Sequence, residues 1–187
     1  TYWLSQLRAV CPDAEIVIVE GNHDARIRKA VERNLPEAAN LKAAGDDRSV
    51  LDIVRLLGLD DLDIQWVGSP YPKGWMLWDR IRCEHGSTVR GKGGQTVAAL
   101  AASAVVDTVC GHIHRREQAA RVIKGRYGPK LVQTLSPGCL TRTDGAVPPG
   151  GDPDWHQGIG FCSWDPESDH VSMHSIPIID GRMVWRD

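Results

Sequence analysis

The chain has 187 residues, 42% of them hydrophobic and 25% charged, and a formal net charge of -2 at pH 7. This length and composition predict an ordinary globular protein with one sizeable core. A net charge so close to zero favours neither the presence nor the absence of nucleic acid as a partner. The longest apolar stretches fall far short of the roughly 20 residues that a membrane span needs, so no membrane contact is predicted.

The cysteines are widely spaced, odd in number and free of any C-x-x-C pair, which argues against a structural zinc knuckle. Cys83 and Cys110 lie within apolar runs and are interpreted as small buried hydrophobic residues. This usage indicates a reducing compartment, and a cytoplasmic location is predicted. The five positions are Cys11, Cys83, Cys110, Cys139 and Cys162.

Apolar side chains at helical spacing predict a helix over residues 1–10, which the segment Cys11-Pro12-Asp13 ends. A strand is predicted over residues 15–19, because four β-branched residues follow one another there. The strand runs into Gly21-Asn22-His23-Asp24, a set of polar side chains that can bind metal. Open α/β sheets carry their chemistry at such carboxyl ends of strands.

A helix is predicted over residues 25–33, with Asp24 near its start, where a carboxylate is favoured. Two interpretations of its basic side chains stand side by side: a solvated helix face, or steering of an anionic substrate. Residues 35–63 contain many Pro, Gly and Asp residues and one predicted helix, 49–57, and are interpreted as an insertion or cap. The basic residues are Arg26, Arg28, Lys29 and Arg33.

Two further strands are predicted over residues 64–68 and 75–83, the second ending at Glu84-His85-Gly86. Trp66, Trp75 and Trp78 could stack on nucleic-acid bases, but packing in the core or on a sheet face is the favoured interpretation.

Residues 87–94 form a glycine-rich loop that does not fit the P-loop pattern. Its basic residues Arg90 and Lys92 are candidates for contact with a substrate phosphate. A helix is predicted to follow over residues 96–104.

A strand over residues 105–110 is predicted to end at Gly111-His112-Ile113-His114. If the backbone there is extended, both histidines project from one face, and Gly86 and Gly111 allow tight turns. Later strands are expected over 117–124, 130–135, 158–164, 171–177 and 182–185. His156, His170 and His174 lack a glycine-flanked strand end and are not expected to belong to the site.

The order Gly-Asn-His-Asp, His-Gly and Gly-His-x-His resembles the calcineurin-like metallophosphoesterase superfamily, over residues 14–140. Ser136-Pro137-Gly138-Cys139-Leu140 resembles the Pro-Gly-Ser turn of its nuclease and small phosphodiesterase branches, and Arg26 and Arg28 resemble a basic segment of phage-type members. The predicted helices and strands together indicate a two-sheet α/β sandwich, which is the fold that the resemblance implies, and the length indicates a single domain over residues 1–187. The family's opening Asp-x-His and Gly-Asp motifs are not visible before Gly21, so the chain is expected to lack the first strand-helix unit.

The resemblance also implies a phosphoric ester hydrolase with two divalent ions, Mn, Fe or Zn, of which Mn is favoured. One ion is expected to be held by Asn22, His85 and His112, and His114 contributes to the other. A hydroxide that bridges the ions is the expected nucleophile, and His23 the expected general acid. Structural support is expected from Gly21, Asp24, Gly86, Gly111 and Asp107.

These expectations leave alternatives open. The substrate could be a nucleic acid, a cyclic nucleotide or other small diester, or a phosphoprotein, with a phosphodiesterase or nuclease favoured. Because most ligands of the second ion are not visible, the isolated 187-residue chain is expected to be inactive or nearly so. The rival class is a non-catalytic protein-binding scaffold with the same fold. Such relatives typically lose the histidine of the Asn-His pair, whereas His23 is present. The oligomeric state stays open.

Overall fold

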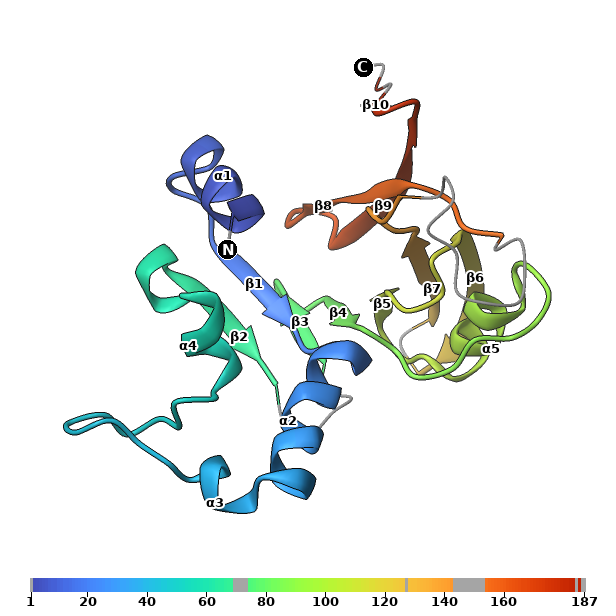
Figure 1. The fold of residues 1–187 in the computed structure, drawn as a ribbon. Helices are drawn as coiled ribbons and strands as arrows, with labels where there is room; N and C mark the ends of the chain where they lie inside the picture. Colours follow the sequence, from blue (N-terminus) through green and yellow to red (C-terminus); the bar gives the residue numbers. More distant parts are fainter. Residues whose placement is uncertain (1, 69–73, 127, 143–153, 184, 186–187) are drawn as a thin grey trace. The chain divides into compact units, whose positions relative to one another are not determined.

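The computed structural model describes residues 2–68, 74–126, 128–142, 154–183 and 185 (Figure 1). The chain divides into two compact units, Thr1–Lys73 and Gly74–Asp187, and each is described by itself. Both units contain helices and strands, which confirms the predicted α/β class. That residues 1–187 form one domain stays a prediction.

The first unit is built around two parallel strands, β1 and β2, with Ile16 opposite Ile64. Parallel strands need a crossover connection, and the helices between them provide it. Residues 35–63 all lie in this crossover, and their role as an insertion or cap stays a prediction. The elements in order are α1 (Tyr2–Val10), β1 (Ile16–Val19), α2 (Asn22–Asn34), α3 (Pro36–Ala39), α4 (Ile53–Leu57), the short 3-10 helix η1 (Asp60–Leu62) and β2 (Ile64–Val67).

Two helices of this unit begin elsewhere than predicted. Helix α2 starts at Asn22, so Asn22 and His23 lie in its first turn and not in a loop before it. Helix α4 starts only at Ile53, because the carboxylate of Asp52 caps it by accepting hydrogen bonds from the backbone N–H groups of Val54 and Arg55. The predicted helix over residues 49–57 was therefore too long at its start.

The second unit contains two sheets, with strand orders β3-β4-β5-β7-β6 and β10-β9-β8. In the first sheet, β4 runs parallel to β5 and β5 parallel to β7, so their carboxyl ends meet at one edge. The elements are β3 (Trp75–Leu77), β4 (Ile81–Glu84), α5 (Gln95–Ser103), β5 (Asp107–Cys110), β6 (Arg116–Gly125), β7 (Gly128–Pro137), β8 (Gly158–Asp165), β9 (His170–Ile179) and β10 (Arg182–Met183).

The five-stranded sheet of this unit is covered on both faces. Ile81 and Leu135 pack against Met173 of β9 on one face, and all three are almost fully buried. On the other face, Val97 of α5 packs against Cys110 and Ile113. Helix α5 also lies against β6 and β7 (Figure 1). The unit is thus layered as helix, five-stranded sheet and three-stranded sheet.

The predicted single strand over residues 75–83 was wrong, because the chain turns back there in a hairpin. β3 pairs antiparallel with β4, and the N–H of Arg80 donates to the carbonyl oxygen of Leu77 (3.0 Å). Trp78 and Asp79 at the turn both have a φ of 54°. Three residues, 78–80, connect the paired Leu77 and Ile81, and none of them is the Gly or Asn that usually marks a hairpin turn.

Most other elements end within about two residues of their predicted bounds. Within the part of the chain that the structure describes, no helix is both long and apolar enough to cross a membrane. The cytoplasmic location stays a prediction.

Candidate functional site

The parallel strands β4 and β5 bring two of the predicted histidines together. Glu84 and Cys110, their last residues, lie opposite each other, and the N–H of Gly111 donates to the carbonyl oxygen of Glu84 (3.0 Å). His85 follows Glu84 directly, and His112 follows Cys110 after Gly111. Nε2 of His85 lies 3.2 Å from Nδ1 of His112, and the two rings are tilted by 59°.

This separation suits two ligands of one metal ion. Imidazole nitrogens bind zinc-like ions at roughly 2.0–2.1 Å, so two nitrogens about 100° apart around an ion are separated by about 3.2 Å. The same 3.2 Å between His85 and His112 also fits a hydrogen bond between the rings when one nitrogen carries a proton. The two nitrogens therefore fit two of the ligand positions of a tetrahedral or octahedral metal site, and metal binding would replace the hydrogen bond between the rings.

The backbone around His112 and His114 is not extended, so the expectation of two side chains on one face of a strand was wrong. His112 has a φ of 67° and His114 a φ of 60°. The N–H of Ile113 donates to the carbonyl oxygen of Gly111 (2.7 Å), which closes a three-residue turn around His112. Turns of this kind with positive φ are rare and strained, and such strain concentrates at functional sites.

His114 lies beside His156, which the sequence analysis set apart from the site, and beside Trp155, which it did not consider. The ring of His114 meets the ring of Trp155 edge to face, with centroids 4.4 Å apart. The N–H of His156 donates to the carbonyl oxygen of His114 (2.9 Å). Nδ1 of His156 accepts from the N–H of Arg116 (3.2 Å), so the proton of that ring is on Nε2, which faces Asp154.

The end of β7 holds this segment in place. The N–H of Cys139 donates to the carbonyl oxygen of His156, and the N–H of Gly158 donates to the carbonyl oxygen of Cys139. Gly138, with a φ of 100°, lies so close that a side chain would collide with the carbonyl oxygen of His156. The turn that resembles the family's Pro-Gly-Ser segment thus anchors residues next to His114.

Among the described residues, no three His, Cys, Asp or Glu side chains gather closely enough to hold a metal ion. Of the predicted ligands, the structure pairs His85 and His112, and His114 does not complete a group of three with them. Asn22 and His23 belong to the other unit.

In the first unit, Gly21-Asn22-His23-Asp24 forms the start of α2. The carboxylate of Asp24 accepts a hydrogen bond from the N–H of Gly21 (2.9 Å), which fixes the first turn. Gly21 is buried, whereas the imidazole of His23 and the guanidinium of Arg26 are exposed. Asp24 thus lies where the sequence analysis expected a carboxylate, and its support of the site stays a prediction.

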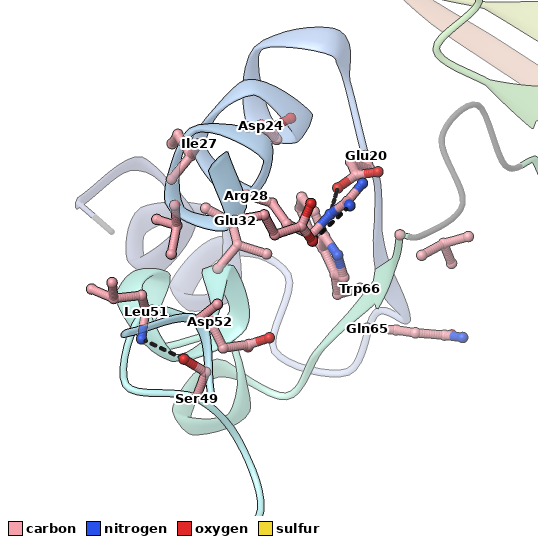
Figure 2. A pocket seen from close by; sticks show the side chains of 15 residues that line it. Glu20, Asp24, Ile27, Arg28, Glu32, Ser49, Leu51, Asp52, Gln65 and Trp66 are labelled. Atoms are coloured by element: carbon pink, nitrogen blue, oxygen red, sulfur yellow. Dashed lines mark hydrogen bonds and ion pairs between the residues drawn. The ribbon is translucent and has the colours of Figure 1, made fainter. Parts of the chain in front are cut away.

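Arg28 does not stand free on the helix surface. It forms ion pairs with the buried Glu20 (3.6 Å) and with Glu32 one turn along the helix (3.3 Å), as Figure 2 shows. Two carboxylates offset its charge, which weakens its attraction for a phosphate. Contact of Arg28 with substrate remains a prediction.

These residues border a cavity of about 450 Å³ in the first unit, shown in Figure 2. Trp66 lines it together with the apolar side chains of Ile27 and Leu51. Among the residues that line this cavity, Arg28 carries a positive charge and four residues carry carboxylates. The cavity therefore suits neutral or positively charged groups better than phosphate. The lining carboxylates are Glu20, Asp24, Glu32 and Asp52.

Ser87, Thr88 and Arg90 of the glycine-rich loop, residues 87–94, line a cavity together with Gly86 and Gly111, the chain neighbours of the histidine pair. The basic side chains of the loop, Arg90 and Lys92, are exposed. The N–H of Arg90 donates to Oγ1 of Thr96 (2.9 Å), and its carbonyl oxygen accepts from Nη2 of Arg115 (2.8 Å). Motif reasoning missed Arg115, because its role depends on contacts between segments distant in sequence.

Asp107 links two strands below the site. Its Oδ1 accepts a hydrogen bond from the N–H of Gln133 (2.7 Å), which joins β5 to β7. Burial raises the pKa of its carboxyl group, although the hydrogen bond from Gln133 and the charge of Lys130 oppose this shift.

Two thiols of the second unit, Cys110 and Cys162, have raised pKa values. Burial, with the charges of Glu84 and Glu117, raises the pKa of Cys110 to about 12. Burial also raises the pKa of Cys162 to about 11. Because the thiolate is the nucleophile, these two thiols are expected to react slowly at neutral pH.

Comparison of the chain with protein-family models, curated proteins and solved structures finds no match. The resemblance to metallophosphoesterases therefore rests on the residues and strand ends described above.

Proposed function

We propose that this chain belongs to a metal-dependent hydrolase of phosphoester bonds, a binuclear metallophosphoesterase that acts as a phosphodiesterase or nuclease. The observation that carries the proposal is the pair of His85 and His112. Their ring nitrogens lie 3.2 Å apart at the ends of two parallel strands, next to a strained turn.

The calcineurin-like two-sheet sandwich is part of the proposal. The second unit supports it with two packed sheets, a helix on the outer face and site residues after parallel strands. The first unit supports it with a βαβ crossover in which Asn22 and His23 begin the helix that follows β1. Both arrangements put polar residues where open α/β sheets bind ligands.

In this proposal, His85 and His112 hold one divalent ion, with Mn favoured over Fe or Zn, and His114 contributes to a second. Such ions, when bound, supply a water of lowered pKa and neutralise the negative charge of the phosphate group. His85 and His112 must then present unprotonated nitrogens toward the ion, because a protonated imidazole nitrogen cannot bind metal. Metal binding is therefore expected to weaken at acid pH.

His23 is assigned the transfer of a proton to the leaving oxygen. Its imidazole is exposed in the first turn of α2, a 13-residue helix. The partial positive charge at a helix start favours an approaching phosphate. The backbone bond between Gly21 and Asp24 fixes the turn from which His23 projects.

The first test measures Mn(II) binding to the 187-residue chain by electron paramagnetic resonance, with His174→Ala on β9 as the matched control. His174 is exposed and lies on the three-stranded sheet. We expect His85→Ala and His112→Ala each to weaken binding at least about tenfold, and the control to bind like the unmodified chain. Equal binding by all four proteins would rule out the histidine pair as ligands.

The second test measures hydrolysis by the full product of the gene that encodes these residues. Single-stranded DNA, a cyclic nucleotide and a phosphopeptide are compared as substrates, which separates nuclease, small-diester and phosphatase activity. We expect His23→Ala to lower kcat by about a hundredfold or more with metal binding retained. Metal binding without hydrolysis of any substrate would favour the non-catalytic scaffold.

A further inference from the structure

We propose that Arg115, held by Glu117, positions the glycine-rich loop of residues 87–94 as the wall of the histidine site that contacts the substrate's phosphate. This inference rests on the proposed function and extends it to the recognition of the phosphate group. Arg115 follows His114 directly in the chain and precedes β6.

Arg115 and Glu117 form a buried ion pair. Their side chains are 8% and 5% exposed, and Nε of Arg115 lies 2.8 Å from Oε1 of Glu117. This approach lacks the angles of a hydrogen bond, and neither oxygen of Glu117 accepts one from the described residues. Buried ion pairs of this kind are seldom more stable than apolar side chains of the same size. Stability alone is thus a poor explanation for two charges at this place.

The guanidinium of Arg115 has a second contact, and this one reaches the loop. Nη2 donates to the carbonyl oxygen of Arg90 (2.8 Å), while the N–H of Arg90 donates to Oγ1 of Thr96 (2.9 Å). Both polar backbone groups of Arg90 are therefore held. The neighbouring glycines, 91, 93 and 94, otherwise give the loop wide conformational freedom.

The backbone of Arg115 is fixed as well. Its carbonyl oxygen accepts a hydrogen bond from Oγ of Ser136 (2.7 Å), a fully buried residue near the end of β7. Gly93 of the loop lies close to the carboxylate of Glu117. Arg115 thus joins the loop after β4, the turn that carries His114 and the end of β7.

The consequence concerns the basic side chains of the loop. Arg90 and Lys92 are exposed, and they project from a backbone that Arg115 holds in one place. A cation on a fixed backbone loses less conformational entropy when it binds an anion than one on a mobile loop. The loop is therefore expected to bind phosphate more tightly while Arg115 holds it.

The test separates positioning from stability with three variants. Arg115→Met leaves the carboxylate of Glu117 buried without its partner and is expected to destabilise the fold. The double variant Arg115→Met with Glu117→Met removes both charges and is expected to recover the melting temperature. The matched control is Arg121→Met, because Nη2 of Arg121 on β6 donates to the carbonyl oxygen of Ala104 at the same 2.8 Å.

Two readouts are made on the Mn(II)-loaded chain: amide hydrogen exchange at Arg90, and the Kd of inorganic phosphate by calorimetry. In the double variant we expect exchange at Arg90 to be about tenfold faster and the Kd about fivefold higher, with Mn(II) binding unchanged. The control is expected to match the unmodified chain in both readouts.

A double variant that matches the unmodified chain in exchange and Kd would show that Arg115 has a structural role alone, and would overturn the inference. If the unmodified chain binds Mn(II) but no phosphate, the inference that the loop contacts phosphate is wrong, and the proposed metal site is supported. If it binds neither, the proposed function falls and this inference with it.

Discussion

At the scale of single residues, Asp107 is a carboxyl group whose charge opposes folding. Burial raises its pKa above the ordinary 3.8, so the ionised form is less stable in the folded chain than in the unfolded one. The protonated carboxyl group is the form that the fold favours. The stability that it contributes is fully present below pH 3.8 and is lost as the pH rises through the folded-state pKa.

We therefore predict that Asp107→Asn melts at a higher temperature than the unmodified chain at pH 7. Asparagine keeps the oxygen that accepts the hydrogen bond from Gln133 but carries no charge. Near pH 3, where both chains are uncharged at this position, the difference should disappear. Calorimetry at the two pH values checks this, and a lower melting temperature at pH 7 would show that the charge itself is needed.

The sequence predicted some of the residues around the histidine site and not others. His85 and His112 could be predicted as neighbours because each follows an apolar run that reads as a strand, and parallel strands end together. Trp155 and His156 could not be found in this way. They reach His114 through backbone hydrogen bonds between β7 and a segment far along the chain, and no local pattern encodes such contacts.

At the scale of elements, the turn between β3 and β4 contains avoidable strain. Trp78 and Asp79 both have positive φ, a conformation that glycine adopts freely and other residues adopt at a cost. Trp78 stacks on Trp164 with ring centroids 6.2 Å apart, and a substitution of Trp78 would remove this contact. Asp79 is therefore the residue to change.

We predict that Asp79→Gly stabilises the chain by about 1 kcal/mol. Urea unfolding followed by tryptophan fluorescence measures the change. The control is Met76→Gly in the neighbouring β3, where the backbone is extended and glycine should destabilise the strand. Loss of stability in both variants would mean that the carboxylate of Asp79 contributes more than the backbone strain costs.

Most elements could be predicted because apolar periodicity decides them. Helix α5 and strands β6 to β9 lie within about two residues of their predicted bounds. The predicted bounds are wrong where a local backbone conformation or a helix cap, and not apolar periodicity, sets the end of the element. Asp52 sets the start of α4, and the tight turn at Trp78 splits one predicted strand into two.

At the scale of the whole molecule, the second unit contains its own core. Both clusters of buried side chains, around Leu135 and around Val97, lie within Gly74–Asp187. We predict that a polypeptide of these residues folds by itself. The single domain that the sequence analysis expected over residues 1–187 stays a prediction.

Thiol reactivity measures this directly. In the isolated second unit at pH 8, Cys110 and Cys162 should resist a disulfide reagent until urea is added, because their pKa values are raised to about 12 and about 11. Circular dichroism should show the strands of both sheets. Rapid labelling of both thiols without urea would indicate that the second unit needs residues of the first to fold.

The left-handed backbone at His112 and His114 also bears on how this site could be lost in evolution. In a lineage where the two imidazoles no longer serve binding, glycine or asparagine at either position would relieve strain, whereas alanine would keep it. Loss of the site would then bring a gain in stability, and drift should be biased toward those two residues. Descendants that have lost the site would thus be recognisable by Gly-Gly-x-Gly or Gly-Asn-x-Asn in place of Gly-His-x-His.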